Sequence, residues 1–134
     1  MIQPNMTIEG LQEAQAAMNK VLAELQPRGA YGRAVQLVTI GAHSYLVSIT
    51  HVDTGAYRAA QRAQVRLEQE PRGVVFVDPS ARNPRTGERP ADYALDEEAR
   101  GGSHAAYRRT VSEAGPRLLS QADAILIGAM PRGR

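Results

Sequence analysis

The chain has 134 residues, of which 43% are apolar and 22% charged, and its net charge of +2 does not call for a nucleic-acid partner. This length fits one domain over residues 1–134, and the composition is that of an ordinary soluble globular protein. The absence of cysteine excludes disulfides and thiolate metal sites, and no apolar run approaches the roughly 20 residues needed to cross a bilayer.

Two amphipathic helices are predicted in the first part of the chain, after an irregular or short extended N-terminal arm over residues 1–10. The first helix covers about 11–25, where the apolar residues recur at spacings of three and four and share one stripe: Leu11, Ala14, Met18, Val21, Leu22 and Leu25. Pro27 ends this helix, because the residue before a proline is disfavoured in the α region. The same periodicity predicts a second helix over about 29–49, and the short joint suggests that the two helices are neighbours.

A short turn is predicted where the helical pattern breaks. Asp53 and Thr54 are good N-cap residues, and Gly55 tolerates unusual backbone angles. We expect these residues to start a helical turn that runs through Tyr57, with the tyrosine ring packed back on the core. Asp53, Thr54, Gly55 and Tyr57 thus form a predicted structural motif.

A β-hairpin and a long loop are predicted next. Apolar and polar residues alternate over about 61–69, which is typical of a half-exposed strand, and a Pro-Arg-Gly turn leads to a second, more buried strand over 73–78. Residues 79–91 contain three prolines, a glycine and three arginines, which predicts a loop. A loop of this length in so small a domain is a candidate for a functional role.

The last part of the chain is predicted to be mainly helical. Residues 92–95 fit a short strand or the start of a turn, and Ser103 is placed to cap a helix over about 104–114. Pro116 is well placed to open a separate helix over 116–129. Together the elements predict an α+β fold, in which two N-terminal helices and a C-terminal helix pack on a small antiparallel sheet. With one Phe and no Trp, its core is expected to be thin and rich in alanine.

Candidate catalytic groups do not assemble into a convincing site. His51 and Asp53 could hold a metal ion, but no recognised spacing supplies a third ligand. Ser103 and His104 lack the strained G-x-S-x-G turn that is typical of a catalytic serine. A small hydrolase that uses His104 or the acids at 96–98 is therefore only a minor alternative. We therefore expect no enzyme, no cofactor and no metal site.

The arginines leave a second reading open. Arg82, Arg85 and Arg89 of the long loop could contact phosphates, although Glu88 lies among them and no aromatic residue is interleaved. The alternative function is an Arg-rich nucleic-acid-binding accessory protein.

Three segments resemble the signatures of a family of tailed-bacteriophage neck proteins, which act in tail completion and head–tail joining. Residues 51–60 (HVDTGAYRAA) are similar to its P-V-D-T-G-x-L-R-x-S signature, which follows two N-terminal helices and precedes a strand hairpin. Residues 93–101 (YALDEEARG) resemble its Y-A-x-x-x-E-x-G segment, and residues 104–111 (HAAYRRTV) resemble the H-P-F-L-R-P-A opening of a helix. His51 stands where proline is usual in the family.

The resemblance implies a structural virion protein in the neck or tail of a long-tailed phage. Its expected partners are copies of itself, the head connector or stopper, and the tail tube or tail terminator. The copies would close into a ring of six subunits, with twelve as the alternative. DNA would pass through the lumen without specific binding, and no membrane is involved. The N-terminus lacks the basic and apolar stretches of a signal peptide, so we expect synthesis in the host cytoplasm.

Ring closure requires contacts between different surfaces of adjacent subunits. We expect the N-terminal ten residues and the long loop to make such contacts. The candidate interface pairs the arginines of the loop on one subunit with an acidic run on the next: Arg82, Arg85 and Arg89 with Asp96, Glu97 and Glu98. Such charge pairs would orient the subunits more than they would add affinity.

Overall fold

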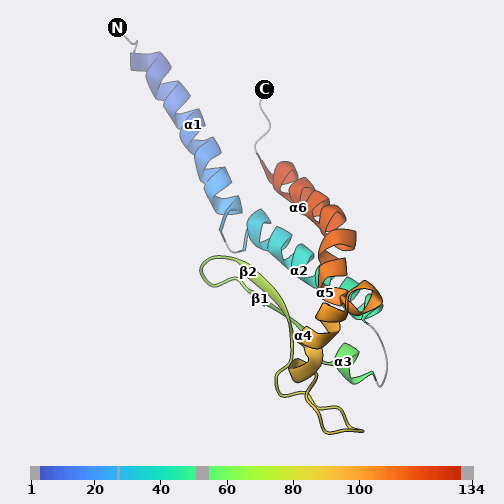
Figure 1. Cartoon of the computed structure of the whole chain (residues 1–134). Coiled ribbons are helices and arrows are strands. Elements are labelled where there is room, and N and C mark those ends of the chain that lie inside the picture. The colour runs from blue at the N-terminus through green and yellow to red at the C-terminus, as the bar shows by residue number, and fades with distance from the viewer. Residues whose placement is uncertain (1–3, 27, 51–54, 131–134) are drawn as a thin grey trace.

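The computed structural model describes residues 4–26, 28–50 and 55–130 of the chain (Figure 1). Its elements in chain order are helices α1 (Pro4–Glu24), α2 (Ala30–Ile49) and α3 (Ala56–Ala59), strands β1 (Gln61–Arg66) and β2 (Arg72–Val77), helix α4 (Pro90–Arg100), a 3₁₀ turn (Gly102–His104), helix α5 (Ala106–Arg109), a π-helical turn (Thr110–Ala114) and helix α6 (Gly115–Ala129). The two strands form one antiparallel sheet, which confirms the predicted α+β class.

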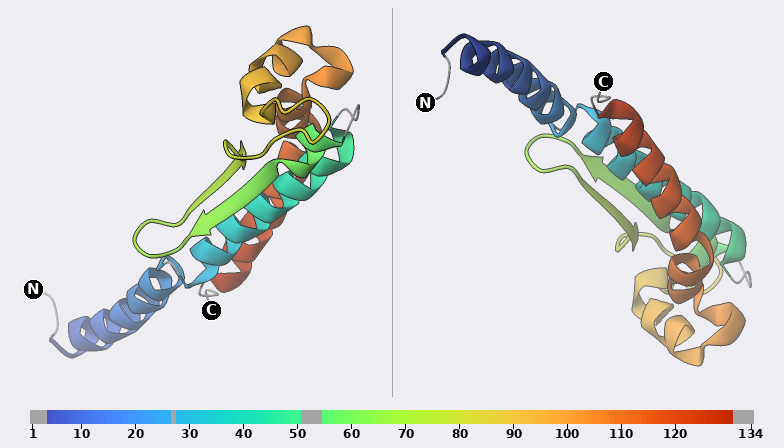
Figure 2. Two further views of the ribbon diagram at one scale, coloured as in Figure 1. Left: turned by 90° about the horizontal axis from the view of Figure 1, so that it is seen from below. Right: turned by 90° about the horizontal axis from the view of Figure 1, so that it is seen from above.

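Helix α2 is the centre of the molecule, because it is covered on two sides. The hairpin packs along one side of α2, and α6 packs along another, so that the three form successive layers (Figure 2). The hairpin register places Gln61 opposite Val77 and Arg66 opposite Arg72. Helices α4 and α5 close the end of the body at which α2 and β1 meet α3 (Figures 1 and 2).

The core is thin and built from small side chains, as the composition predicted. Seven of the ten buried apolar residues described are alanines, and the list also contains Leu46, Tyr57 and Leu118. Small side chains let backbones approach closely, and the hairpin does so at Gly73. A Cβ atom at Gly73 would lie 1.6 Å from Oγ1 of Thr39, a buried residue of α2.

The predicted irregular N-terminal arm is wrong for residues 4–10, which belong to α1. Pro4 is the first residue of the helix, a position where its fixed φ is favourable and its missing N–H costs nothing. No further proline follows until residue 27, so the helical pattern read from Leu11 continues back to Pro4. The helix meets α2 at the joint and then projects beyond the body (Figures 1 and 2).

The prediction of a strand or turn at 92–95 is also wrong, because these residues lie inside α4. The signals of a helix were present: Pro90 begins it, Asp92 lies in its first turn and Arg100 in its last. The long loop therefore ends at Arg89, two residues earlier than predicted.

The C-terminal region forms one continuous helical path over 106–129 instead of two separate helices. A π-helical turn, with the N–H of Gly115 donating to the carbonyl of Thr110, precedes Pro116 and widens the helix where the proline ring must fit. Ser103 is not an N-cap; it lies in the 3₁₀ turn.

Strand β2 has fewer exposed residues than β1, as predicted, but none of its residues is fully buried. Its first half is exposed, with Val74 at 45%, and its second half is half-buried, whereas β1 is mainly exposed after the buried Gln61. The incomplete burial follows because a two-stranded sheet packed on one helix buries only one of its faces. No helix in the described part of the chain is long and apolar enough to cross a membrane.

Candidate subunit interface

Helix α1 exposes the apolar stripe that the sequence predicted. Residues 11–20 are all exposed, and the large apolar side chains of the stripe reach high exposures: Leu11 63%, Met18 59%, Leu22 48% and Leu25 47%. A helix in a protein gains most of its stability from packing such a face, and the described residues outside α1 leave this face largely exposed. We call these four residues the α1 stripe.

The joint between α1 and α2 fixes the direction of α1. A carboxylate oxygen of Glu24, at the end of α1, accepts a hydrogen bond of 2.9 Å from the backbone N–H of Ala30 and lies 3.5 Å from the guanidinium of Arg33. Gly29 allows the tight passage, since a Cβ atom there would lie 2.5 Å from the carbonyl oxygens of Ala23 and Glu24. The first turn of α2 thus holds the last turn of α1.

A second apolar surface lies on the body, where α2 and α6 run side by side. A shallow groove between them is lined mainly by apolar atoms, and its lining residues are Arg33, Gln36, Leu37, Ile40, Gly41, Arg117, Leu118, Gln121 and Ile125. We call it the α2–α6 groove. Ile40 is 49% exposed. Outside the groove lining, α6 also exposes Leu119 and Ile127, at 60% and 73%.

The structure gives the three acids of the predicted interface different surroundings. Glu98 binds the start of α5, accepting hydrogen bonds from the backbone N–H groups of Tyr107 at 2.6 Å and Arg108 at 3.4 Å. Glu97 lies 2.7 Å from His104 and 3.5 Å from Arg100. These two carboxylates therefore have roles within the chain.

Asp96 is the acid of the three that is exposed on α4, and it has no ion pair among the residues that the structure describes. It is the member of the acidic run best placed to meet another molecule. On the same helix Leu95 is 81% exposed.

The arginines of the long loop are likewise unequal. Arg89 forms a two-pronged pair with Asp92, at 3.0 and 3.1 Å, and Arg82 donates to the carbonyl of Gly87 at 3.0 Å. The side chain of Arg85 is exposed, and its backbone N–H donates to the Oδ1 atom of the buried Asn83. The loop is thus ordered by its own hydrogen bonds and presents Arg82 and Arg85 outward.

The signature segment is described only in part. Asp53 and Thr54 lie outside the described residues, so their predicted capping stays a prediction. Gly55 has a left-handed φ of 83° immediately before α3. Tyr57 is 7% exposed, and its ring lies 5.9 Å from that of Tyr93 on α4.

A buried polar cluster joins the elements at this end of the body. Gln61, only 3% exposed, accepts a hydrogen bond of 2.5 Å from the hydroxyl of Tyr107 and donates one of 3.3 Å to the carbonyl of Tyr57. His43 of α2 lies 3.2 Å from the carbonyl of Gln61. We call these four residues the Gln61 cluster. It connects α2, α3, β1 and α5, and sequence reasoning missed it because its members lie far apart in the chain.

Burial sets the ionisation of the two tyrosines in this cluster. It raises the pKa of the Tyr107 hydroxyl well above its usual range, helped by the nearby Tyr57 and by the negative charge of Glu98. Burial also raises the pKa of Tyr57, although Gln61 partly offsets this effect. Neither tyrosine is therefore poised to act as a base near neutral pH.

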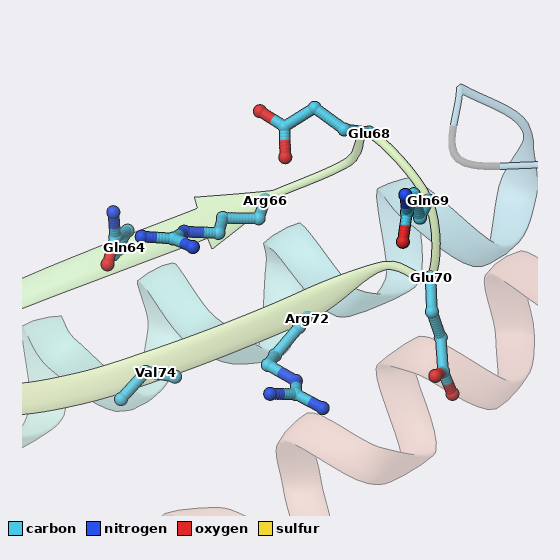
Figure 3. Close-up of a pocket in the computed structure, with 7 residues that line it drawn as sticks. All are labelled: Gln64, Arg66, Glu68, Gln69, Glu70, Arg72 and Val74. Carbon is cyan, nitrogen blue, oxygen red and sulfur yellow. The ribbon is translucent and has the colours of Figure 1, made fainter.

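A hollow of about 580 Å³ at the tip of the hairpin does not have the form of a ligand site (Figure 3). Its lining residues are all exposed: Gln64, Arg66, Glu68, Gln69, Glu70, Arg72 and Val74. The carboxylates of Glu68 and Glu70 point away from each other instead of converging (Figure 3). Small-molecule sites bury most of the ligand and aim a few polar groups at it, and this surface does neither.

Within the described residues, no group of three or more metal-ligating side chains is close enough to hold an ion. Comparison of the chain with protein-family models, with curated proteins and with solved structures finds no match.

Proposed function

We propose that this protein is a structural subunit of the neck of a long-tailed bacteriophage, where copies of it close into a ring between the head connector and the tail tube. In this role the protein binds copies of itself and its neighbours in the virion and carries out no chemical reaction. DNA passes through the lumen of the ring without sequence-specific contacts.

The observation that carries the proposal is the exposed apolar surface of α1. Helix α1 projects from the body, and its stripe has no partner among the described elements of the chain (Figures 1 and 2). Contiguous exposed apolar surface of this kind is typical of a protein–protein contact. A ring of like subunits needs two different contact surfaces on each copy, and the projecting helix offers one of them.

The order of elements supports the same assignment. The resemblance implies two helices before the V-D-T-G signature, a hairpin after it and a helix that closes the domain. Helices α1 and α2, the β1–β2 hairpin and helix α6 occur in that order. The agreement concerns the arrangement of elements and supports the resemblance, which otherwise depends on short motifs.

The nucleic-acid alternative depends on the three arginines of the long loop, and two of them are engaged within the chain. Arg89 pairs with Asp92, and Arg82 donates to the carbonyl of Gly87. Arginines paired in this way have fewer donors left for phosphates.

Electron microscopy of the purified, concentrated protein tests the proposal. Closed rings with a central opening are expected, whereas only filaments or only single particles would contradict the proposal.

A titration with duplex DNA at two salt concentrations distinguishes the ring subunit from the nucleic-acid-binding alternative. A ring subunit should bind weakly as a monomer, and tight binding that falls steeply with salt would favour the accessory protein.

A further inference from the structure

We infer that Glu24 is a positioning residue that sets the direction of α1 relative to the body, and that this direction decides whether associating copies close into a ring. The part of the inference that concerns direction depends only on contacts within one chain. The part that concerns closure rests on the proposed function.

Glu24 supplies the side-chain cap of the helix that follows it. The first N–H groups of a helix have no acceptor within the helix, and a side-chain oxygen of the N-cap residue usually binds one of them. The N-cap of α2 is Gly29, which has no side chain to do this. The Oε2 atom of Glu24 instead accepts a hydrogen bond of 2.9 Å from the N–H of Ala30, a residue with no exposed surface. Because a buried N–H needs a partner, the start of α2 depends on a group that belongs to α1.

A second contact fixes the carboxylate of Glu24 more firmly. The same oxygen atom lies 3.5 Å from Nη2 of Arg33, which is one turn further along α2. A negative charge is favoured at the N-terminus of a helix, and an ion pair with arginine adds to this attraction. The last turn of α1 can therefore rotate away from α2 only if both contacts of the carboxylate break.

The backbone between the two helices is compact. The N–H of Gly29 donates a hydrogen bond of 2.9 Å to the carbonyl of Gln26. A Cβ atom at Gly29 would lie 2.5 Å from the carbonyl oxygens of Ala23 and Glu24, so the approach of α1 to the start of α2 requires glycine. This close approach brings the side chain of Glu24 within reach of the N–H of Ala30.

The joint is the main hold on α1 within the described chain. Residues 11–20 are all exposed, and no other described element packs extensively on this helix (Figures 1 and 2). The helix has 21 residues and is therefore about 30 Å long. A small rotation at Glu24 is thus amplified into a large displacement of the far end of α1.

The direction of α1 matters for a ring because α1 carries the exposed stripe. Head-to-tail contacts between like subunits close into a ring only when every contact imposes the same suitable rotation, and they otherwise continue into an open filament. If α1 changed its direction freely, successive contacts would impose different rotations. A fixed joint at Glu24 therefore favours one closed assembly.

Distances between two spin labels, measured by electron paramagnetic resonance, test the direction of α1. The chain contains no cysteine of its own, so two can be introduced as labelling sites. Met18→Cys on α1 and Leu119→Cys on α6 replace side chains that are 59% and 60% exposed. The labelled protein is diluted in an excess of unlabelled protein, so that only distances within one chain are measured. The inference expects one narrow distance distribution.

Three further substitutions in the labelled chain identify the role of the carboxylate. Glu24→Ala should lose the narrow distribution while its circular dichroism remains that of the folded protein. Glu24→Gln keeps a side-chain oxygen that can accept the bond from Ala30, and its distribution should be narrower than that of Glu24→Ala. The matched control is Glu13→Ala, which removes an exposed glutamate of α1 that has no ion pair among the described residues and should leave the distribution unchanged.

A narrow distribution in Glu24→Ala would overturn the inference, as would a broad one in the labelled parent chain. Equal widths for Glu24→Gln and Glu24→Ala would also overturn it, because the bond to Ala30 would then not hold the helix. If Glu24→Ala does not fold, Arg33→Ala takes its place, since it removes a side chain that is 57% exposed. An unbroadened distribution in Arg33→Ala would then overturn the inference.

Electron microscopy of the same substitutions without labels tests ring closure separately. Glu24→Ala should still associate but should give open or irregular assemblies in place of closed rings. Closed rings of the parental subunit number from Glu24→Ala would overturn the role of Glu24 in closure. A parent chain with a narrow distribution that forms no rings would instead remove the proposed function and keep the role of Glu24 in the direction of α1.

Discussion

Glu98 illustrates at the residue scale how one side chain can belong to the fold although its sequence context suggests an interface. It lies in a run of three acids, which the sequence presents as an exposed charged surface. In the structure its carboxylate accepts hydrogen bonds from N–H groups at the start of α5. The N-cap residue there is Ala105, which has no side-chain oxygen to accept these bonds. The spacing of nine residues between Glu98 and Tyr107 hides this role from any local motif.

The first prediction concerns this cap. Glu98→Ala should lower the free energy of unfolding by about 0.5–2 kcal/mol, as for loss of other helix caps. Asp96→Ala, two residues away and exposed, should stay within about 0.5 kcal/mol of the parent. Urea denaturation of the two variants measures both values. If Glu98→Ala unfolded like the parent but failed to associate, the carboxylate would belong to the interface.

The second prediction concerns the contact between the hairpin and α2. Gly73→Ala forces a methyl group against Thr39 and should cost about 1–3 kcal/mol of stability, as overpacking does elsewhere. Gly128→Ala is the matched control, because nothing lies within 4 Å of a Cβ atom there and alanine favours a helix. Thermal unfolding should therefore shift in opposite directions, and equal shifts would show that Thr39 can move aside.

At the scale of elements, the helices with strong apolar periodicity were predictable and the elements set by distant contacts were not. Helix α2 was predicted to within a residue, because its apolar face and the flanking proline and glycine are local signals. Helix α4 was missed, since it shows no long apolar periodicity and is completed by contacts of Glu97 and Glu98 with residues that follow it. The stripe on α1 was predicted, but its exposure depends on the joint at Gly29.

The candidate site was predictable to a smaller extent than the fold. The arginines of the loop and the acids at 96–98 were identified by charge alone, and charge does not tell which side chains are already paired within the chain. The groove could not be predicted, because Ile40 of α2 and Leu118 and Ile125 of α6 line it together only when the two helices lie side by side.

The third prediction follows from the Gln61 cluster. The folded chain holds the protons of Tyr57 and Tyr107 at a pH where the unfolded chain, with tyrosine pKa values near 10, has released them. Stability should therefore fall as the pH rises above about 10. Tyr107→Phe should make this fall less steep than in the parent protein. Denaturation at several alkaline pH values measures the slopes, and equal slopes for the two proteins would contradict the prediction.

At acidic pH the dependence of stability on pH has the opposite sign. Hydrogen bonds from Ser80 lower the pKa of Asp78, and the bond from the Tyr45 hydroxyl lowers that of Glu113. Glu113 is exposed and Asp78 is half-buried at the surface, so their effect on stability is small and screened. It is present above about pH 4 and is lost as the pH falls through the depressed pKa values.

At the scale of the whole molecule, the chain has one body and one projecting arm, and the proposed function follows from this division. The body contains the alanine-rich core and the groove, and the arm is α1 with its stripe. A small domain with a thin core gains stability when its exposed apolar surfaces meet those of its neighbours. The assembly is therefore expected to melt at a higher temperature as the protein concentration rises.

The fourth prediction concerns the different roles of the arm in association and of the body in folding. Leu22→Asp puts a charge in the stripe and should abolish association. It should leave the unfolding of the dilute monomer nearly unchanged, because residues 11–24 of α1 contribute no buried side chain to the core. Leu95→Asp, at a more exposed apolar site on α4, should still associate. Size-exclusion profiles measure association, and thermal unfolding at low concentration measures the stability of the monomer. A large loss of monomer stability in Leu22→Asp would mean that α1 packs on its own chain.

The mass of the unmodified protein in solution, measured by light scattering over a concentration series, tests the central claim most directly. The account predicts that the mass rises from that of the 14.5 kDa monomer to one discrete whole-number multiple, with six copies expected, and then stays constant as the concentration increases further. A mass that remained at 14.5 kDa at every concentration would contradict the claim, as would one that grew without limit.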